Sequence, residues 1–384
     1  MTPAARVAAA IDILDRILGG APAEQALTTW ARGSRFAGSK DRAAIRDLVF
    51  DSLRRKRSRA HLGGAMTGRG LMIGALREDQ RDPDDVFSGI GYAPSPLSEQ
   101  VRQLPGAPPT EAVRLDCPEW LEGQLRDSLG ADFAPVLEAL RQRAPVYLRV
   151  NTLKADVATA QAALAEAGIV TQRNDLASTA LEVTSGARAV SASQAYKDGL
   201  VELQDAASQA VVEALGPLGQ SDRILDYCAG GGGKTLALAA LSGAPVAAHD
   251  AHARRMGDLP GRAKRAGARI SLVDQPESLW DLVLIDVPCS GSGAWRRQPD
   301  AKWRLTEADL QGLRQTQAAI MDRVAALVAP TGRLAYATCS ILDAENGAQV
   351  GAFLERHPDW LATKSLRLLP TQGGDGFFVT ILTR

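Results

Sequence analysis

Apolar residues recur at helical spacing through the first part of the chain. They fall every three or four positions over residues 7–18 and again over 45–53, with polar residues between them. This pattern predicts that residues 1–75 form a small helical domain. A second helical stretch covers 76–144, and the prolines within it indicate a connector with several loops.

The pattern changes near Pro145, where short apolar runs begin to alternate with helical stretches. Two strands and the helix between them predict a β-α-β subdomain over 145–204: 146–150, 156–167 and 181–183. Further apolar runs and helical patterns follow at 223–226, 235–241, 245–250, 281–286, 306–328 and 333–338. Strands that alternate with helices are typical of a parallel, doubly wound sheet, so we predict a Rossmann-like α/β domain over 205–384.

The charge is balanced overall but not along the chain. Basic and acidic residues number 44 each, which excludes a uniformly cationic nucleic-acid binder. Residues 1–75, however, hold 13 basic against 6 acidic residues, a net charge of +7, and the remainder carries −7. This asymmetry indicates a nucleic-acid partner for the basic segment, or else arginines on a solvated helical face.

The sequence carries no signal for export or membrane insertion. Asp12, Asp15 and Arg16 interrupt any apolar core of a secretory peptide, and no run of about 18 apolar residues is present. The four cysteines form no CxxC pair, so we expect neither a disulfide framework nor a metal site. These features favour a cytoplasmic protein.

A glycine-rich loop follows the strand at 223–226. From Asp226 to Thr235 the sequence reads DYCAGGGGKT. It is not a P-loop, because Cys228 stands where that motif needs glycine, and it is not GxGxxG, because Thr235 replaces the last glycine. Such a loop still lets the backbone approach a ligand closely at the carboxyl end of a strand, although a plain glycine-rich turn is the alternative.

An acidic residue ends each of two successive strands. Asp226 can bind a cation, such as the amino group of an amino-acid-like ligand. Asp250, 24 residues later, is placed to accept both hydroxyls of a ribose, unless it only caps a helix. The pair points to a nucleoside with no phosphate to be cradled, a description that S-adenosylmethionine fits.

Two cysteines follow predicted strands at the same edge of the sheet. Cys289 lies in the run that begins with Asp286-Val-Pro, and Cys339 lies between Thr338 and Ser340. A lone cysteine is usually a small buried hydrophobe. Two at the ligand-binding edge instead fit pyrimidine chemistry, in which a thiolate adds to C6 of cytosine so that C5 can attack a methyl group.

These motifs together resemble the RNA cytosine-C5 methyltransferases, the family of the bacterial rRNA enzymes and the NOL1/NOP2/Sun proteins. The resemblance covers about residue 115 to the end and implies a class I methyltransferase fold. It implies that Cys339 forms the covalent adduct, that Cys289 assists product release, and that Asp286 and Lys234 serve the base site. It also implies contacts to S-adenosylmethionine from Asp226, Cys228, Ala229, Gly230, Gly231, Gly232, Lys234, Asp250, Asp274 and Asp286.

Other features bear on the RNA partner. Residues 38–55 resemble the NusB-like RNA-binding domain of one bacterial branch that modifies small-subunit rRNA, and the basic run 54–59 would then contact phosphates. Trp295 and Trp303 would stack on bases, or else pack in the core. We expect a monomer acting on 16S rRNA. The alternatives are the same reaction on tRNA, or a catalytically weak assembly factor, since Gly230-Gly231 replaces the family's usual Ala-Pro.

Overall fold

The computed structural model describes residues 1–103 and 105–384. The described residues divide into two compact units. Unit 1 comprises 1–126, 130–143 and 295–304, and unit 2 comprises 127–129, 144–294 and 305–384. Residues 295–304, which follow Cys289 closely in the sequence, therefore belong to the helical unit. The sequence did not reveal this. The finer four-part division at residues 75, 144 and 204 stays a prediction.

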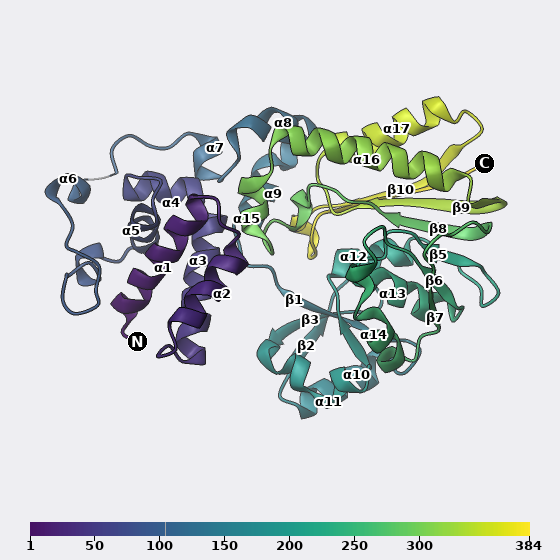
Figure 1. The fold of residues 1–384 in the computed structure, drawn as a ribbon, viewed down its shortest axis with the longest axis horizontal. Helices are drawn as coiled ribbons and strands as arrows, with labels where there is room; N and C mark the ends of the chain where they lie inside the picture. Colours follow the sequence, from purple (N-terminus) through teal and green to yellow (C-terminus); the bar gives the residue numbers. More distant parts are fainter. Residues whose placement is uncertain (104) are drawn as a thin grey trace. The chain divides into compact units, whose positions relative to one another are not determined.

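Unit 1 is all helical, as predicted (Figure 1). Its main helices are α1 (Pro3–Leu18), α2 (Ala23–Gly33), α3 (Ser39–Arg54), α4 (Lys56–Gly63) and α5 (Gly68–Glu78). The shorter helices are η1 (Pro83–Asp85), α6 (Glu99–Arg102), α7 (Glu111–Arg114), η2 (Glu119–Leu121), α8 (Glu122–Leu129), η3 (Gly130–Asp132), α9 (Phe133–Leu140) and α15 (Pro299–Arg304). Helices α4 and α5 pack closely because Gly74 has no side chain: a Cβ there would lie 2.0 Å from the carbonyl oxygen of Arg59.

The subdomain that follows has more strands than the predicted β-α-β unit. It contains β1 (Val146–Val150), α10 (Val157–Glu166), β2 (Val170–Arg173), β3 (Ala180–Ser185), η4 (Ala187–Ala192), α11 (Gln194–Lys197) and β4 (Val201–Leu203). The strands form an antiparallel sheet in the order β2-β3-β1-β4. The pattern missed β2 because none of its residues is buried, so it has no apolar alternation.

The predicted doubly wound domain is confirmed. Its strands are β5 (Ile224–Asp226), β6 (Val246–Ala248), β7 (Ile270–Leu272), β8 (Trp280–Asp286), β9 (Val328–Thr338), β10 (Leu361–Leu368) and β11 (Phe377–Thr383). They lie in the order β10-β11-β9-β8-β5-β6-β7, with β11 antiparallel to its neighbours. The chain order reverses between β5 and β8, and ligands bind outside the carboxyl ends of strands at such a switch point.

Helices cover both faces of this sheet (Figure 1). They are α12 (Ala206–Glu213), α13 (Gly233–Ser242), α14 (Leu259–Ala266), α16 (Glu307–Ala325) and α17 (Gly347–Arg356), with short helices η5 (Ala253–Met256), η6 (Ser292–Ala294), η7 (Asp343–Glu345) and η8 (Pro370–Gln372). Ile224 packs in a core with α12 and α13, whereas its neighbour Leu225 packs in a core with α16 and α17. Strands buried on both faces read as continuous apolar runs, which is why the sequence revealed them.

Some predicted boundaries are wrong. The helix expected over 306–328 ends at Ala325, and Val328 already begins β9. Strands β7, β10 and β11 were not predicted. Most residues of β7 and β10 are exposed, whereas β11 was missed although most of its residues are buried. No helix among the described residues is long and apolar enough to cross a membrane.

Candidate active site

The glycine loop joins the end of β5 to the start of α13 at the switch point. Gly230 has φ +54° and Gly232 has φ +79°, a left-handed conformation that residues with a side chain rarely adopt. A Cβ on Gly232 would lie 2.2 Å from Leu259 Cδ1. Gly230 stands where the family usually has alanine. It therefore allows the backbone to adopt this left-handed conformation without strain.

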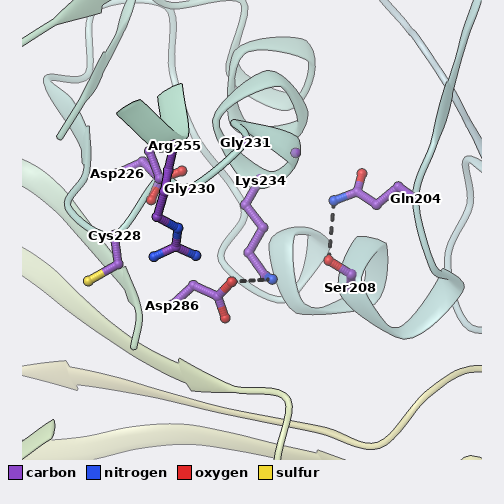
Figure 2. Close-up of a pocket in the computed structure, with 11 residues that line it drawn as sticks. Gln204, Ser208, Asp226, Cys228, Gly230, Gly231, Lys234, Arg255 and Asp286 are labelled. Atoms are coloured by element: carbon purple, nitrogen blue, oxygen red, sulfur yellow. Dashed lines mark hydrogen bonds and ion pairs between the residues drawn. The ribbon is translucent and has the colours of Figure 1, made fainter. Parts of the chain in front are cut away.

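The loop forms one wall of a pocket at the carboxyl ends of β5 and β8 (Figure 2). Its lining residues are Gln204, Ser208, Asp226, Cys228, Ala229, Gly230, Gly231, Gly233, Lys234, Arg255 and Asp286. Most of the predicted cofactor contacts thus surround one cavity. Three predicted contacts do not line it: Gly232, Asp250 and Asp274.

Asp226 lies in the wall of this pocket, and only one of its two carboxylate oxygens forms a hydrogen bond. Thr235 Oγ1 donates to Asp226 Oδ2 at 2.7 Å, whereas Oδ1 is buried without a hydrogen-bond partner. Burial raises the pKa of Asp226 to about 7, although the bond from Thr235 opposes this shift. A buried acceptor without a partner is unfavourable, so this atom fits a ligand that brings a donor, such as the amino group of S-adenosylmethionine.

Asp250 shapes the pocket from behind the glycine loop. Its Oδ2 accepts a hydrogen bond from Gly230 N at 2.9 Å, its Oδ1 accepts one from His252 N at 2.9 Å, and Arg255 lies 3.3 Å from Oδ2. A carboxylate has about four acceptor sites, so at least one site is left for a ribose hydroxyl. Asp274 is exposed after the end of β7.

Lys234 and Asp286 form an ion pair across the pocket (Figure 2). Lys234 Nζ donates to Asp286 Oδ2 at 2.7 Å, and the ammonium lies 4.8 Å from the centre of the Phe377 ring. Burial acts to lower the pKa of Lys234, but the charge of Asp286 and the hydrogen bond to it outweigh burial and raise the pKa. The pair joins the first turn of α13 to the last residue of β8, and it holds a proton at Nζ beside the carboxylate.

The two cysteines of the strand ends face one another. Cys289 Sγ and Cys339 Sγ are 3.4 Å apart. The hydrogen bond with Cys339, together with burial, raises the pKa of Cys289 well above its ordinary value. Cys228 differs from them because it packs against the core that Leu225 forms with α16 and α17. Burial raises its pKa too, which fits a neutral thiol in the pocket wall.

Three side chains of the site were not among the predicted contacts. Gln204 Nε2 donates to Ser208 Oγ at 3.2 Å. Arg149 donates to Gln204 Oε1 at 2.7 Å and to the carbonyl oxygen of Gly233 at 2.9 Å, so Gln204 lines the pocket beside the start of α13. Arg255 enters the pocket from the segment after β6. The sequence held a partial signal, because Gln204-Asp205-x-x-Ser208 is similar to a short motif of the RNA cytosine-C5 methyltransferases. Arg255 gave none.

Protein families and individual known proteins are similar in sequence to this chain. A family model described as "16S rRNA methyltransferase RsmB/F" matches residues 213–383, and one described as a RsmF/B-like ferredoxin-like domain matches 117–190. The "Ribosomal RNA small subunit methyltransferase B" of Salmonella arizonae is 31% identical over 334 residues, covering 82% of this chain and 73% of the relative. Its Vibrio cholerae counterpart is 34% identical over 337 residues, covering 82% and 72%.

The chain belongs to the RsmB/F family of RNA methyltransferases. Membership makes S-adenosylmethionine its methyl donor and RNA its substrate class. Solved structures agree on the fold: that of PH0851 has a TM-score of 0.78 at 23% identity and covers 100% of this chain and 99% of its own. That of NSun6 from Pyrococcus horikoshii has a TM-score of 0.62 at 18% identity and covers 69% and 98%.

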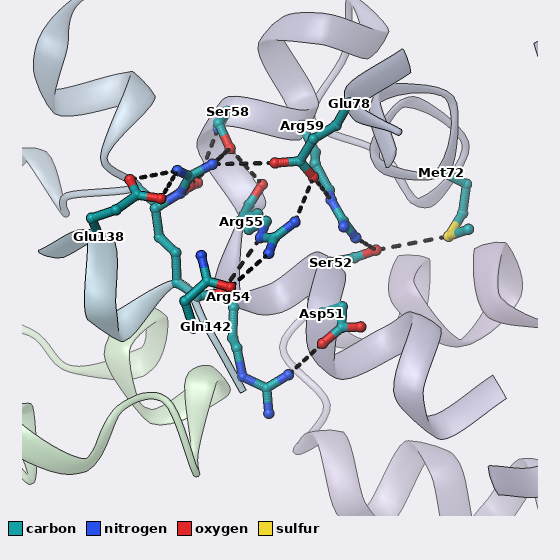
Figure 3. Close-up of polar contacts among 12 residues, drawn as sticks. Asp51, Ser52, Arg54, Arg55, Ser58, Arg59, Met72, Glu78, Glu138 and Gln142 are labelled. Atoms are coloured by element: carbon teal, nitrogen blue, oxygen red, sulfur yellow. Dashed lines mark hydrogen bonds and ion pairs between the residues drawn. The ribbon is translucent and has the colours of Figure 1, made fainter. Parts of the chain in front are cut away.

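The basic run of this RsmB/F chain does not present the expected free charges (Figure 3). Arg54 and Arg59 are only 7% and 5% exposed. Arg59 donates to Glu78 at 2.9 Å and to Ser52 at 3.0 Å, and Arg54 donates to Asp51 at 2.6 Å. Arg55 also pairs with Glu78 at 3.1 Å. The prediction of phosphate contacts is wrong for Arg54 and Arg59, because both are buried inside unit 1.

Both tryptophans expected near the target base are also engaged within unit 1. Trp295 is 1% exposed, so its ring is not available for stacking on a base. Trp303 Nε1 donates to the carbonyl oxygen of Leu53 at 2.6 Å, and Lys56 lies 4.2 Å from the centre of its ring. The core-packing alternative therefore holds for Trp295, and Trp303 is anchored between α3 and α4.

Proposed function

We propose that this RsmB/F chain methylates C5 of a cytosine in 16S rRNA through a covalent bond between Cys339 Sγ and C6 of the base. The observation that carries the proposal is the 3.4 Å approach of Cys289 and Cys339 at the sheet edge that also holds the Lys234–Asp286 pair. Two thiols beside an acid–base pair fit pyrimidine addition and elimination, and a methyl transfer to an oxygen or an exocyclic nitrogen needs neither thiol.

Each group has a defined task in this reaction. The thiolate of Cys339 adds to C6, which makes C5 nucleophilic. S-adenosylmethionine, when bound, supplies the electrophilic methyl group. The Lys234–Asp286 pair holds a proton where N3 and the exocyclic amine of the base would lie, which neutralises the charge that addition places on the ring. After transfer, C5 loses its proton to a base and the C6–S bond breaks, which returns Cys339 as thiolate.

Cys289 is suited to that second half of the reaction. Its raised pKa keeps it a neutral thiol beside Cys339. A neutral thiol can stabilise the departing sulfur by hydrogen bonding, and it does not compete as a nucleophile, since the thiolate is the reactive form. We therefore assign adduct formation to Cys339 and product release to Cys289.

The pocket residues fit the methyl donor. The orphan oxygen of Asp226 takes the amino group, the glycine loop passes close to the ligand, and Asp250 contacts the ribose. We assign Asp274 to the adenine side, because it follows β7 at the same sheet edge.

Bisulfite sequencing of total RNA from a strain that lacks the protein tests this proposal. Bisulfite spares 5-methylcytosine, so we expect one protected cytosine of 16S rRNA to become convertible, and re-expression to restore it. Loss of protection in tRNA instead would move the substrate to tRNA. Unchanged protection in all RNA would leave the assembly-factor alternative. A cytoplasmic monomer remains our prediction, which fractionation and light scattering would check.

A further inference from the structure

A buried carboxylate lies behind the two cysteines and contacts both of their loops. Glu345, the last residue of η7, is fully buried. Its Oε2 accepts hydrogen bonds from Ser290 Oγ and Ser340 Oγ, each at 2.5 Å. Ser290 directly follows Cys289 and Ser340 directly follows Cys339. One oxygen atom therefore bridges the segments that carry the two thiols.

The second oxygen of the same carboxylate strengthens the bridge. Glu345 Oε1 accepts from Ser290 N at 2.8 Å and from Gln317 Nε2 at 3.0 Å, and Gln317 also donates to the carbonyl oxygen of Pro288 at 2.9 Å. The carboxylate thus receives four hydrogen bonds, which matches its about four acceptor sites. Two of the donors are N–H groups that can only donate, so this surrounding suits the ionised form of Glu345.

This geometry distinguishes Glu345 from an ordinary buried acid. A buried charge is unfavourable unless hydrogen bonds compensate it, and here both compensating hydroxyls belong to the neighbours of the catalytic cysteines. The backbone ladder ends with the bond from Val287 N to Ala337 O at 3.0 Å, just before the two thiols. Beyond that point, Gly293 N donates to the carbonyl oxygen of Cys339 at 3.0 Å, and Ser292 Oγ accepts from Ile341 N at 2.9 Å. The carboxylate is the acceptor that both residues next to the thiols share.

We propose that Glu345 is a positioning residue, which ties the Cys289 loop to the Cys339 loop and so keeps the two sulfur atoms in contact. The catalytic consequence rests on the proposed cysteine chemistry, but the geometric claim does not. Without the carboxylate, each loop keeps its own strand but loses the shared acceptor, and the thiols should separate. The negative charge also favours the neutral form of the Cys289 thiol.

Disulfide formation between the two thiols measures their approach without RNA or methyl donor. The reduced full-length protein is treated with diamide, which takes up the two electrons and two protons that the thiols release as the S–S bond forms. Peptide mass spectrometry then quantifies the Cys289–Cys339 link over time. The iodoacetamide reaction rate of the same thiols against pH gives their thiolate fraction, by which the disulfide rate is divided.

Glu345→Gln is the main variant, because an amide nitrogen cannot accept a hydrogen bond from a serine hydroxyl. We expect its normalised disulfide rate to fall at least about tenfold, and the thiol titration to move to lower pH as the charge is removed. Glu355→Gln is the matched control, since Glu355 is exposed on α17, and it should behave as the unchanged protein. A folded Glu345→Gln variant whose normalised rate stays within twofold of the unchanged protein would overturn the proposal.

A second variant covers failure of Glu345→Gln to fold. Ser340→Ala removes the tie from Glu345 to the Cys339 loop, together with the contacts of Ser340 Oγ with Ser292 Oγ and Leu342 N. We expect a severalfold slower disulfide rate, so an unchanged rate would equally refute the bridge. With both substrates supplied, Glu345→Gln should lower kcat and leave KM for S-adenosylmethionine within about twofold. If the chain methylates no cytosine but Glu345→Gln still slows the disulfide, the proposed function fails and the positioning role stands.

Discussion

Lys234 Nζ donates a hydrogen bond to Asp286 Oδ2 at 2.7 Å, which places an ammonium and a carboxylate side by side in the wall of the pocket. Lys234 comes from the first turn of α13 and Asp286 from the last residue of β8. The two residues are 52 positions apart in the sequence and meet only because β5 and β8 are neighbours in the sheet. The proton at this pair gives the first prediction.

Replacing Lys234 by methionine should slow methylation strongly. The change keeps the apolar stem and removes the proton that would neutralise the base during addition, so we expect kcat to fall by roughly 10²–10⁴-fold, the usual range for general acid–base groups. Single-turnover methyl transfer at saturating RNA and donor measures this. Lys264→Met, at an exposed site on α14, is the control and should stay within about twofold. A Lys234→Met variant as fast as the control would remove Lys234 from the chemistry.

Binding of S-adenosylmethionine should depend on the charge of Asp226. Its pKa is raised to about 7 by burial, whereas a ligand ammonium requires the ionised carboxylate. Affinity should therefore rise by about tenfold from pH 6 to pH 8, as the ionised fraction rises. Calorimetric titration at the two pH values measures this, and Asp226→Asn should bind weakly with a flat profile. Equal affinity at both pH values would argue against the contact.

The same raised pKa predicts the pH dependence of stability. The folded protein keeps the Asp226 proton up to about pH 7, whereas an unfolded aspartate releases it near its ordinary pKa of 3.8. This contribution to stability is thus complete below about pH 4 and is lost as the pH rises to about 7. Its upper limit is on the order of 4 kcal/mol. Urea unfolding should show that Asp226→Asn flattens the curve over this window.

In unit 1, buried and exposed arginines should behave differently. Arg59→Ala removes a buried partner of Glu78 and Ser52, so we expect roughly 3 kcal/mol of destabilisation and a lower midpoint of thermal unfolding. Arg35→Ala is its control, because Arg35 is exposed and has no hydrogen-bond or ion-pair partner among the described residues. Similar losses in both variants would contradict this account.

RNA binding by unit 1 should depend on the exposed cations. Arg32, Arg35 and Lys40 are exposed and lack such partners within the described part of the chain. If they contact phosphates, the triple alanine variant should lose affinity and reduce the slope of log K against log salt by about 2 to 3. Filter binding at several salt concentrations tests this. An unchanged slope would place the RNA contacts elsewhere.

The two cysteine roles make opposite predictions. Cys339→Ala should abolish both methylation and any covalent RNA complex, because the thiol assigned to add to C6 is removed. Cys289→Ala should block release and accumulate a protein–RNA adduct that survives a denaturing gel. If Cys339→Ala traps the adduct instead, the two roles are reversed.

Much of the catalytic unit could be predicted from the sequence. Strands such as β5 and β8 are buried on both faces, so they appear as apolar runs. The residues that end them are then placed at one sheet edge by topology alone. Asp226 and Asp286 accordingly line one pocket, and Lys234, which the family resemblance assigns to the base site, lines it too. The motifs that resemble the methyltransferase family lie directly after these strands in the sequence.

What only the tertiary structure decided were the partners of charged and polar side chains. The run 54–59 was predicted to be an RNA-binding surface, but Arg55 and Arg59 pair with Glu78, an acid from a distant segment. Residues 295–304 pack in unit 1, whereas the residues on either side of them in the sequence belong to unit 2. Nothing in the sequence distinguished Glu345 from a surface acid. The fold places it between the Cys289 and Cys339 loops. Hydrophobic periodicity records which face of an element is buried, whereas the pairing of a polar atom depends on which distant segment meets it, and no local pattern contains that information.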